Sequence, residues 1–161
     1  MEEKRIFLPL TDNGICSLKA GDRVLLNGVI TVARDAAHKR LFEAYQNGEK
    51  LPIEINGNTI YYMGPSPARE GAVIGSAGPT TSTRMDKYTP LLLSLGLKGM
   101  IGKGKRSKEV IEAIKENKAV YFAAIGGCGT LLSKCITSSE VICYDDLGAE
   151  AIRKITVKDF P

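Results

Sequence analysis

Short apolar runs flank Asn-Gly pairs in the first third of the chain. The runs are Val24–Leu26 and Val29–Val32 around Asn27-Gly28, then Ile53–Ile55 and Thr59–Tyr62 around Asn56-Gly57. Asn-Gly readily takes the positive φ angles of a two-residue hairpin turn. The pattern therefore predicts two β-hairpins.

A helix is predicted between these hairpins. Leu41, Phe42 and Tyr45 place apolar side chains on one helical face. Asp35 is a suitable N-cap for its start, and Asn47-Gly48 is a suitable end.

From residue 72 onward, short apolar strands alternate with helical patterns. The expected strands are Ala72–Gly75, Gly99–Ile101, Ala119–Ile125 and Val141–Tyr144. The expected helices contain Leu91–Leu95, Val110–Ile114 after a Ser107 cap, and Leu131-Leu132. Pro90 predicts a bend or a new helix start there, with Thr89 as its cap. This alternation predicts a parallel sheet, and residues 1–161 are expected to form one α/β domain, rich in hairpins at its front.

The balance of charged residues favours a small anionic ligand over a nucleic acid. The 161 residues carry 22 Lys+Arg and 18 Asp+Glu, a net charge of +4, with the basic residues scattered among acidic ones. A nucleic-acid-binding protein would carry a basic stripe, whereas a small excess suits attraction of one dianion. The chain has neither a long apolar run nor a signal-peptide pattern, so we expect a cytoplasmic protein that binds no membrane.

Four cysteines, at positions 16, 128, 135 and 143, lack the CxxC spacing of zinc and iron–sulfur sites. We expect reduced and mostly buried thiols, and no metal site in this chain.

The segment Gly75–Met85 carries the densest candidate chemistry. It holds small residues, four consecutive hydroxyls from Thr80 to Thr83, and Arg84, between an expected strand and an expected helix. Hydroxyls and free helix-start N–H groups donate hydrogen bonds, and a guanidinium grips a carboxylate with two parallel bonds. This combination favours an organic acid as ligand. For a single hydroxyl, Ser82 or Thr83, an N-cap is the more common interpretation, but four hydroxyls together argue against it.

Arg34 lies between an expected strand and the start of a helix, where its charge adds to the helix dipole. An ordinary surface ion pair is the alternative interpretation, and position alone does not separate the two. His38, the only histidine, lies one helical turn further on. A lone helical histidine is typically packed or hydrated, so it is assigned no proton transfer.

Two glycine-rich turns complete the candidates. Gly102–Arg106 contains Lys103 between two glycines, a position from which it could hold a carboxylate or phosphate. Gly99–Lys105 fits the start of a P-loop, but Arg106 replaces the required Ser or Thr, which argues against nucleotide binding. Lys105 and Arg106 are expected to be solvated, and Gly126–Thr130 is either a ligand-facing turn or an ordinary tight turn.

Several of these segments together resemble the β-subunit of class I fumarate hydratases and of L(+)-tartrate dehydratases. They are Ala33–Lys39, Tyr62–Pro65, Gly78–Thr81 with Arg84-Met85, and Gly102–Gly104. Their order and spacing match as well. The resemblance covers nearly the whole chain and implies a swivelling β/β/α fold.

The same resemblance implies an iron–sulfur hydro-lyase that interconverts fumarate and L-malate only when two subunits combine. Arg34, Arg84 and Lys103 correspond to cations that bind the substrate carboxylates, and Thr80 to a residue proposed to remove a proton from carbon. The [4Fe–4S] cluster would belong to a partner α-subunit in a hetero-oligomer, with two of each subunit as one arrangement. L(+)-tartrate as substrate, or a free-standing dicarboxylate-binding protein, are the alternatives.

Two departures from the family pattern stand out. Ser82-Thr83 replaces a common Ala-Gly, which bears on substrate choice. Relatives continue beyond the position of Pro161 into another strand, so a truncated sequence, a split gene or a further tail is expected.

Overall fold

The computed structural model describes residues 3–63, 78–79, 81–124 and 132–161. Its early elements are β1 (Glu3–Phe7), α1 (Asp12–Cys16), β2 (Arg23–Val32), α2 (Asp35–Gln46) and β3 (Thr59–Tyr61). The middle elements are the 3₁₀-helix η1 (Ser82–Met85), α3 (Thr89–Ser94), β4 (Gly99–Gly102), α4 (Lys108–Glu116) and β5 (Val120–Ala123). The last are β6 (Ile136–Cys143), the 3₁₀-helix η2 (Asp145–Glu150) and β7 (Ile152–Phe160).

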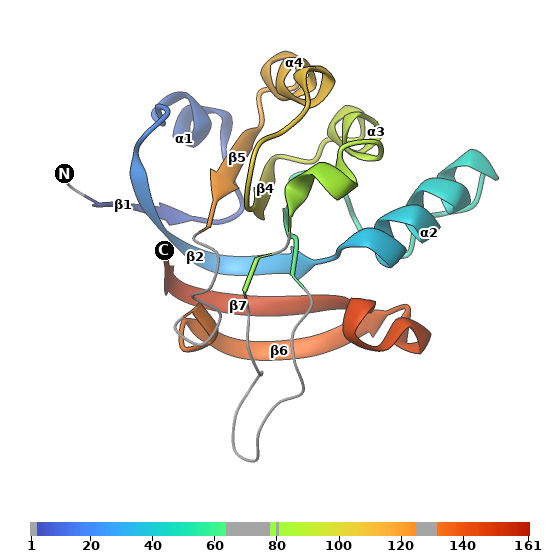
Figure 1. Ribbon diagram of the computed structural model, residues 1–161. Coiled ribbons are helices and arrows are strands. Elements are labelled where there is room, and N and C mark those ends of the chain that lie inside the picture. The colour runs from blue at the N-terminus through green and yellow to red at the C-terminus, as the bar shows by residue number, and fades with distance from the viewer. Residues whose placement is uncertain (1–2, 64–77, 80, 125–131) are drawn as a thin grey trace.

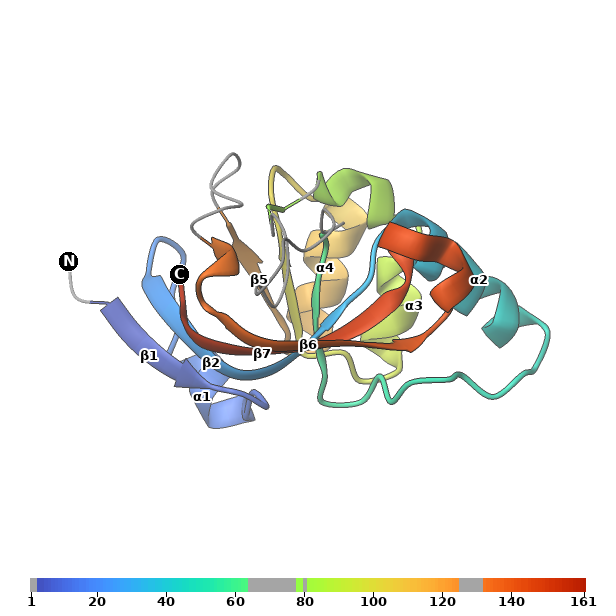
Figure 2. The ribbon, with the colours of Figure 1, turned by 90° about the horizontal axis from the view of Figure 1, so that it is seen from below.

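Within the described residues the strands form one seven-stranded sheet in the order β5-β4-β3-β2-β7-β6, with β1 also paired to β2 (Figure 1). Strands β1 to β5 run parallel to their neighbours, whereas β7 is antiparallel to β2 and β6 is antiparallel to β7. The α/β class is therefore confirmed, and the expected parallel sheet accounts for only part of it. Figure 2 shows the curved band that β1, β2, β7 and β6 form.

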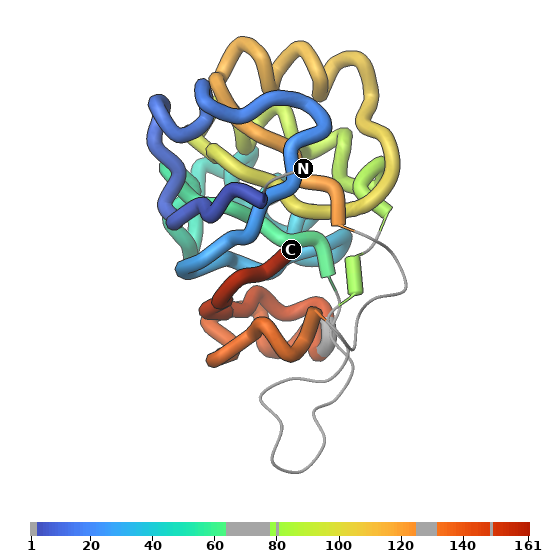
Figure 3. The backbone as a smooth tube through the Cα atoms, turned by 90° about the vertical axis from the view of Figure 1, so that its left-hand side faces the viewer, coloured from blue at the N-terminus to red at the C-terminus, as the bar shows by residue number. Residues whose placement is uncertain are grey.

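Both faces of the sheet are buried at its centre, along β3 and β4. Side chains of β3 alternate between them, because successive residues of a strand point to opposite faces. Ile60 and Tyr62 pack with residues of α2, α3 and α4 in one core cluster. Tyr61 and Met63 pack with residues of β2, β6 and β7 in the other. Figure 3 shows that β1 and the end of β7 lie on the same side of the molecule.

Both hairpin predictions are wrong. Residues 23–32 form one strand, and Gly28 lies at an irregularity where the register with β7 shifts. Its φ of 127° suits glycine, and an added Cβ would meet the Leu8 backbone oxygen at 3.1 Å. Asn27 Oδ1 accepts a bond from the Asp159 N–H at 3.0 Å. The Asn-Gly pair therefore builds a bulge, which needs the same positive φ as a turn.

In the second predicted hairpin, Ile53–Ile55 is not a strand. The Asn56-Gly57 turn precedes β3, which then pairs parallel to β2 and β4. Gly57 N–H donates to the Gly96 carbonyl at 2.9 Å, so this turn is held by the end of α3 rather than by a neighbouring hairpin strand.

The helix predictions hold better. Residues 35–46 form α2, but the cap position is Arg34, and Asp35 is the first helical residue. Ser107 caps α4, accepting from the Val110 N–H at 3.3 Å. Pro90 lies in the first turn of α3, which begins at Thr89 after a separate 3₁₀ turn. The predicted strand at 72–75 lies outside the described residues, as does Leu131 of the predicted helix.

Candidate functional site

The carboxyl ends of β2 and β4 place two of the predicted cations at one edge of the sheet. Both strands pair parallel to β3, so their carboxyl ends share that edge. Arg34 follows β2 and Lys103 follows β4. Both side chains are partly buried.

The segment that carries Arg84 crosses the same edge. Thr81 forms a parallel bridge with Lys103, and Ser82 N–H donates to the Lys103 carbonyl at 3.0 Å. The short helix η1 then places Arg84 beside the start of α2. The structure therefore brings the backbones of Arg34, Arg84 and Lys103 to one edge.

Two carboxylates pair with the two arginines. Asp35 Oδ2 lies 3.4 Å from Arg84 Nη1, and Glu150 Oε1 lies 3.4 Å from Arg34 Nε. Figure 1 shows η2, which ends at Glu150, alongside the beginning of α2. The four side chains form a row of alternating charge across the start of this helix.

This row is incompletely satisfied. Arg34 Nε and Asp35 Oδ1 are both buried, and neither has a hydrogen-bond partner of good geometry. The Arg84 side chain is 56% exposed, against 26% for Arg34. Buried polar atoms without partners are uncommon and are frequently associated with function. The arrangement leaves the guanidinium groups of Arg34 and Arg84 able to donate hydrogen bonds to a carboxylate ligand.

Arg106 corrects the expectation of a solvated charge. Its side chain is only 2% exposed, and its Nε donates to Asp86 Oδ1 at 2.7 Å. Its Nη2 donates to Thr89 Oγ1 at 2.9 Å and to Tyr62 Oη at 3.2 Å. The second Asp86 oxygen accepts from the Ser107 N–H at 2.8 Å. Arg106 therefore ties the turn after β4 to η1 and α3.

A second set of bonds fixes the same turn from the other side. Ser82 Oγ and Tyr121 Oη are 2.8 Å apart, and Tyr121 Oη donates to the Gly104 carbonyl at 2.9 Å. Gly102 lies against this pair, and an added Cβ would collide with Ser82 Oγ. Ser82, one of the departures from the family pattern, thus helps to hold the backbone around Lys103.

His38 is buried beside the ring of Tyr62, at a centroid distance of 5.4 Å. Its Nδ1 donates to the Arg34 carbonyl at 2.9 Å, since a carbonyl only accepts. Burial lowers the pKa of His38 from 6.5 to about 4, which keeps the ring neutral near neutral pH. The ring supports the backbone of Arg34.

Thr80 lies outside the described residues, as do Gly75–Ala77 and Gly126–Thr130. Sequence patterns did not identify Asp35 as the partner of Arg84, nor Glu150 as the partner of Arg34. The sequence could have indicated a role for Asp35, because this residue adjoins Arg34 at a polar helix start. No sequence pattern could have indicated Glu150, because it is distant in sequence from Arg34.

A surface hollow of about 540 Å³ adjoins this edge. Asp35, Arg84 and Asp86 contribute to its lining, together with Lys87. Arg34 and Lys103 do not line it, so the hollow overlaps the predicted site only in part.

The histidine, cysteine and acidic side chains of the described residues are spread over the molecule. Among these residues, no three His, Cys, Asp or Glu side chains gather as a metal would require. Cys16 is exposed, and burial raises the pKa of the Cys135 and Cys143 thiols, which disfavours the thiolate form. The described helices also include none long and apolar enough to cross a membrane.

Comparisons with known proteins give a consistent picture. The family model described as "Fumarase C-terminus" matches residues 2–161. Fumarate hydratase 2 of Leishmania major is 44% identical over 143 residues, which are 88% of this chain and 25% of that protein. The aerobic class I fumarate hydratase of Escherichia coli (strain K12) is 46% identical over 141 residues, 86% of this chain and 26% of that protein.

A shorter relative matches most of its own length. The putative L(+)-tartrate dehydratase subunit beta of Methanocaldococcus jannaschii is 36% identical over 159 residues, 96% of this chain and 82% of that protein. The chain therefore spans about a quarter of the fumarate hydratases and about four-fifths of the tartrate dehydratase subunit.

Proposed function

The chain belongs to the Fumarase C-terminus family, and we propose that it is the β-subunit of an iron–sulfur hydro-lyase that hydrates fumarate reversibly to L-malate. Identities of 44–46% to fumarate hydratases support this substrate. The size match to a protein named as a beta subunit supports a division of the enzyme between two chains. The partner would be a cluster-bearing α-subunit.

The observation that carries the proposal is that Arg34, Arg84 and Lys103 lie on turns at the same edge of the sheet. A four-carbon dicarboxylate is a dianion with charge at both ends. Guanidinium groups match each carboxylate with a planar fork of donors, and an ammonium adds a point charge. Three cations on neighbouring turns therefore suit such a ligand better than a neutral one.

We assign the binding of the substrate carboxylates to Arg34, Arg84 and Lys103, and removal of the proton from carbon to Thr80. A threonine hydroxyl is a weak base at its ordinary pKa, so Thr80 would depend on nearby cations. The [4Fe–4S] cluster of the partner would supply a Lewis acid for the substrate hydroxyl and carboxylate. Among the described residues, Cys16, Cys135 and Cys143 belong to no cluster of side chains that could hold a metal ion.

L(+)-tartrate is the second candidate substrate, because the relative that matches over most of its own length is named for it. Tartrate differs from malate by one hydroxyl group. None of Arg34, Arg84 and Lys103 is specific for that hydroxyl, so these cations serve either substrate.

Copurification of the tagged chain from its native host, under anaerobic conditions, tests the proposal. We expect an iron-containing partner, with turnover of fumarate by the complex and none by the chain alone. Faster turnover of L(+)-tartrate would assign the second substrate instead. Saturable fumarate binding to the isolated chain, unchanged by any partner, would show a free-standing dicarboxylate-binding protein and overturn the proposal.

A further inference from the structure

We infer that Glu150 is a positioning residue that orients Arg34 for its ligand. The identity of that ligand rests on the proposed function, whereas the contact between Glu150 and Arg34 does not. Glu150 ends η2 and therefore reaches the start of α2 from a remote part of the chain.

The start of α2 lacks a cap of its own. Arg34 occupies the cap position and makes no side-chain cap hydrogen bond. The Ala36 N–H instead donates to Glu150 Oε1 at 3.1 Å. A carboxylate at this position satisfies a free helix-start N–H and is favoured by the helix dipole. Glu150 thus supplies the capping oxygen that the Arg34 side chain lacks, from a part of the chain that is distant in sequence.

The same oxygen lies 3.4 Å from Arg34 Nε. One carboxylate oxygen therefore accepts a bond from the helix backbone and places a negative charge beside the arginine side chain, without a hydrogen bond to its Nε. The nearest approach of this ion pair is at Nε, and the Arg34 side chain makes no cap hydrogen bond to α2. A guanidinium whose Nε faces a carboxylate can turn its two terminal nitrogens to a second carboxylate and bind it with two parallel bonds. We therefore expect the charge of Glu150 to keep the Nε of Arg34 turned towards η2.

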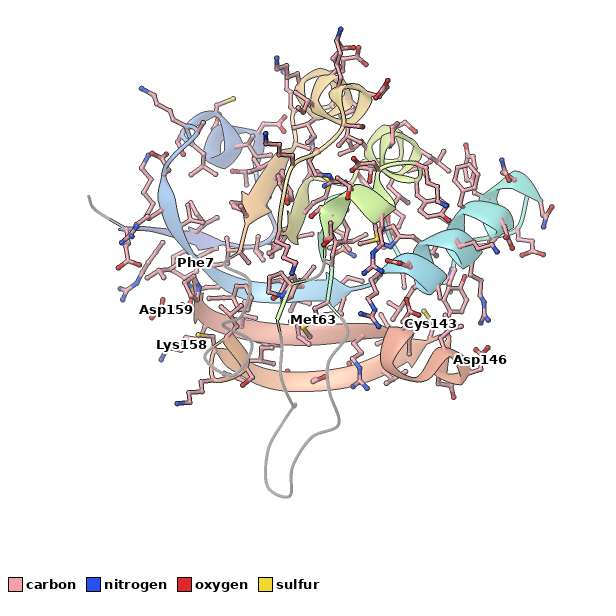
Figure 4. The ribbon with its side chains drawn as sticks, in the orientation of Figure 1. Phe7, Met63, Cys143, Asp146, Lys158 and Asp159 are labelled. Atoms are coloured by element: carbon pink, nitrogen blue, oxygen red, sulfur yellow. The ribbon has the colours of Figure 1, made fainter. Side chains whose placement is uncertain are left out.

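Docking of η2 against α2 does not depend on Glu150 alone. Arg40 donates to both oxygens of Asp146, at 2.8 and 2.9 Å, and its guanidinium lies 4.9 Å from the Tyr144 ring centroid. Figure 4 shows Asp146 on η2 below α2. Asp146→Ala is therefore a matched control, because it removes an acidic residue of η2 that does not contact Arg34.

The first test measures hydrogen exchange of the Arg34 Nε–H by NMR in the isolated full chain, with the resonance assigned by its loss in Arg34→Lys. We expect Glu150→Ala to accelerate this exchange by about tenfold, as a released side chain samples water. Asp146→Ala should change it by less than about twofold. An unchanged rate in Glu150→Ala overturns the inference, and equal acceleration in both variants reduces Glu150 to a general docking role.

The second test measures kinetics of the copurified complex. Glu150→Ala should raise KM about tenfold with kcat within about twofold, because Arg34 binds substrate and transition state alike. Glu150→Gln keeps an oxygen acceptor and should hold KM within about threefold of wild type. A Glu150→Ala complex with wild-type KM overturns the inference. A wild-type complex without hydro-lyase activity would instead contradict the proposed function. The hydrogen-exchange measurement would still test the role of Glu150 in that case.

Discussion

Arg106 provides the sharpest test of how the turn that carries Lys103 is held. The perturbation is Arg106→Met, which removes the charge and keeps much of the side-chain length. Asp86, its partner at 2.7 Å, has a side chain only 12% exposed. The substitution therefore leaves a carboxylate largely buried without its counter-ion, and Thr89 Oγ1 loses a donor.

The magnitude follows from that burial. Removing one partner of a buried ion pair costs about 3–5 kcal/mol, since the remaining charge stays desolvated. For a chain of this length, each kcal/mol lowers the melting temperature by about 2–4 °C. We expect Arg106→Met to lower it by roughly 10 °C and to reduce the free energy of unfolding in urea by about 3 kcal/mol.

Urea unfolding followed by circular dichroism is the assay, with Lys105→Ala as the matched control. Lys105 is an exposed neighbour on the same turn and should change the free energy of unfolding by less than about 0.5 kcal/mol. A double-mutant cycle with Asp86→Asn should give a coupling of at least about 1 kcal/mol. A loss below about 1 kcal/mol in Arg106→Met would refute the reasoning.

Three further predictions concern pH, packing and capping. Because the pKa of His38 is lowered to about 4, only the unfolded chain takes up its proton as pH falls from about 6.5. Stability that is complete above pH 6.5 is thus lost towards pH 4, by up to about 3 kcal/mol, and urea unfolding of His38→Asn should lack this part of the loss. Gly102→Ala should cost about 1–3 kcal/mol, and adding Ser82→Ala should recover part of it in the same assay; no recovery would contradict the predicted clash. Ser107→Ala removes the cap of α4 and should lower the free energy of unfolding by about 1 kcal/mol, whereas an unchanged value would show that the cap is dispensable.

Patterns confined to one helix or strand predicted the structure well. The helix at 35–46 and the strand at 99–102 follow from local periodicity, and Ser107 from cap chemistry. The Asn27-Gly28 pair led to a wrong hairpin prediction, because a positive φ angle is needed in a β-bulge as well as in a hairpin turn. The distinction depends on β7, which pairs with β2 on both sides of Asn27, from Leu26 to Val32.

In the candidate site, too, the residues with a local sequence pattern differ from those whose contacts depend on the fold. Arg34, Arg84 and Lys103 are candidates from the sequence because each lies in a polar turn next to an apolar strand or a helix start. The charge run of Lys105 and Arg106 predicts a solvated Arg106, which the structure contradicts. Its burial depends on Asp86 and Tyr62, which only the fold brings to it. Glu150 could not be predicted, because its contact with Arg34 has no local pattern.

The most direct measurement is fumarate hydration by the copurified complex carrying Arg84→Ala, with Arg5→Ala as control. Arg5 pairs with Asp159, which Figure 4 shows at the opposite end of the sheet from Asp146. Arg84→Ala should lower kcat/KM at least about 100-fold, the loss expected when a charged contact to a bound carboxylate is removed. Arg5→Ala should stay within about twofold of wild type. Near-normal turnover by Arg84→Ala would contradict the assignment of this sheet edge as the substrate site.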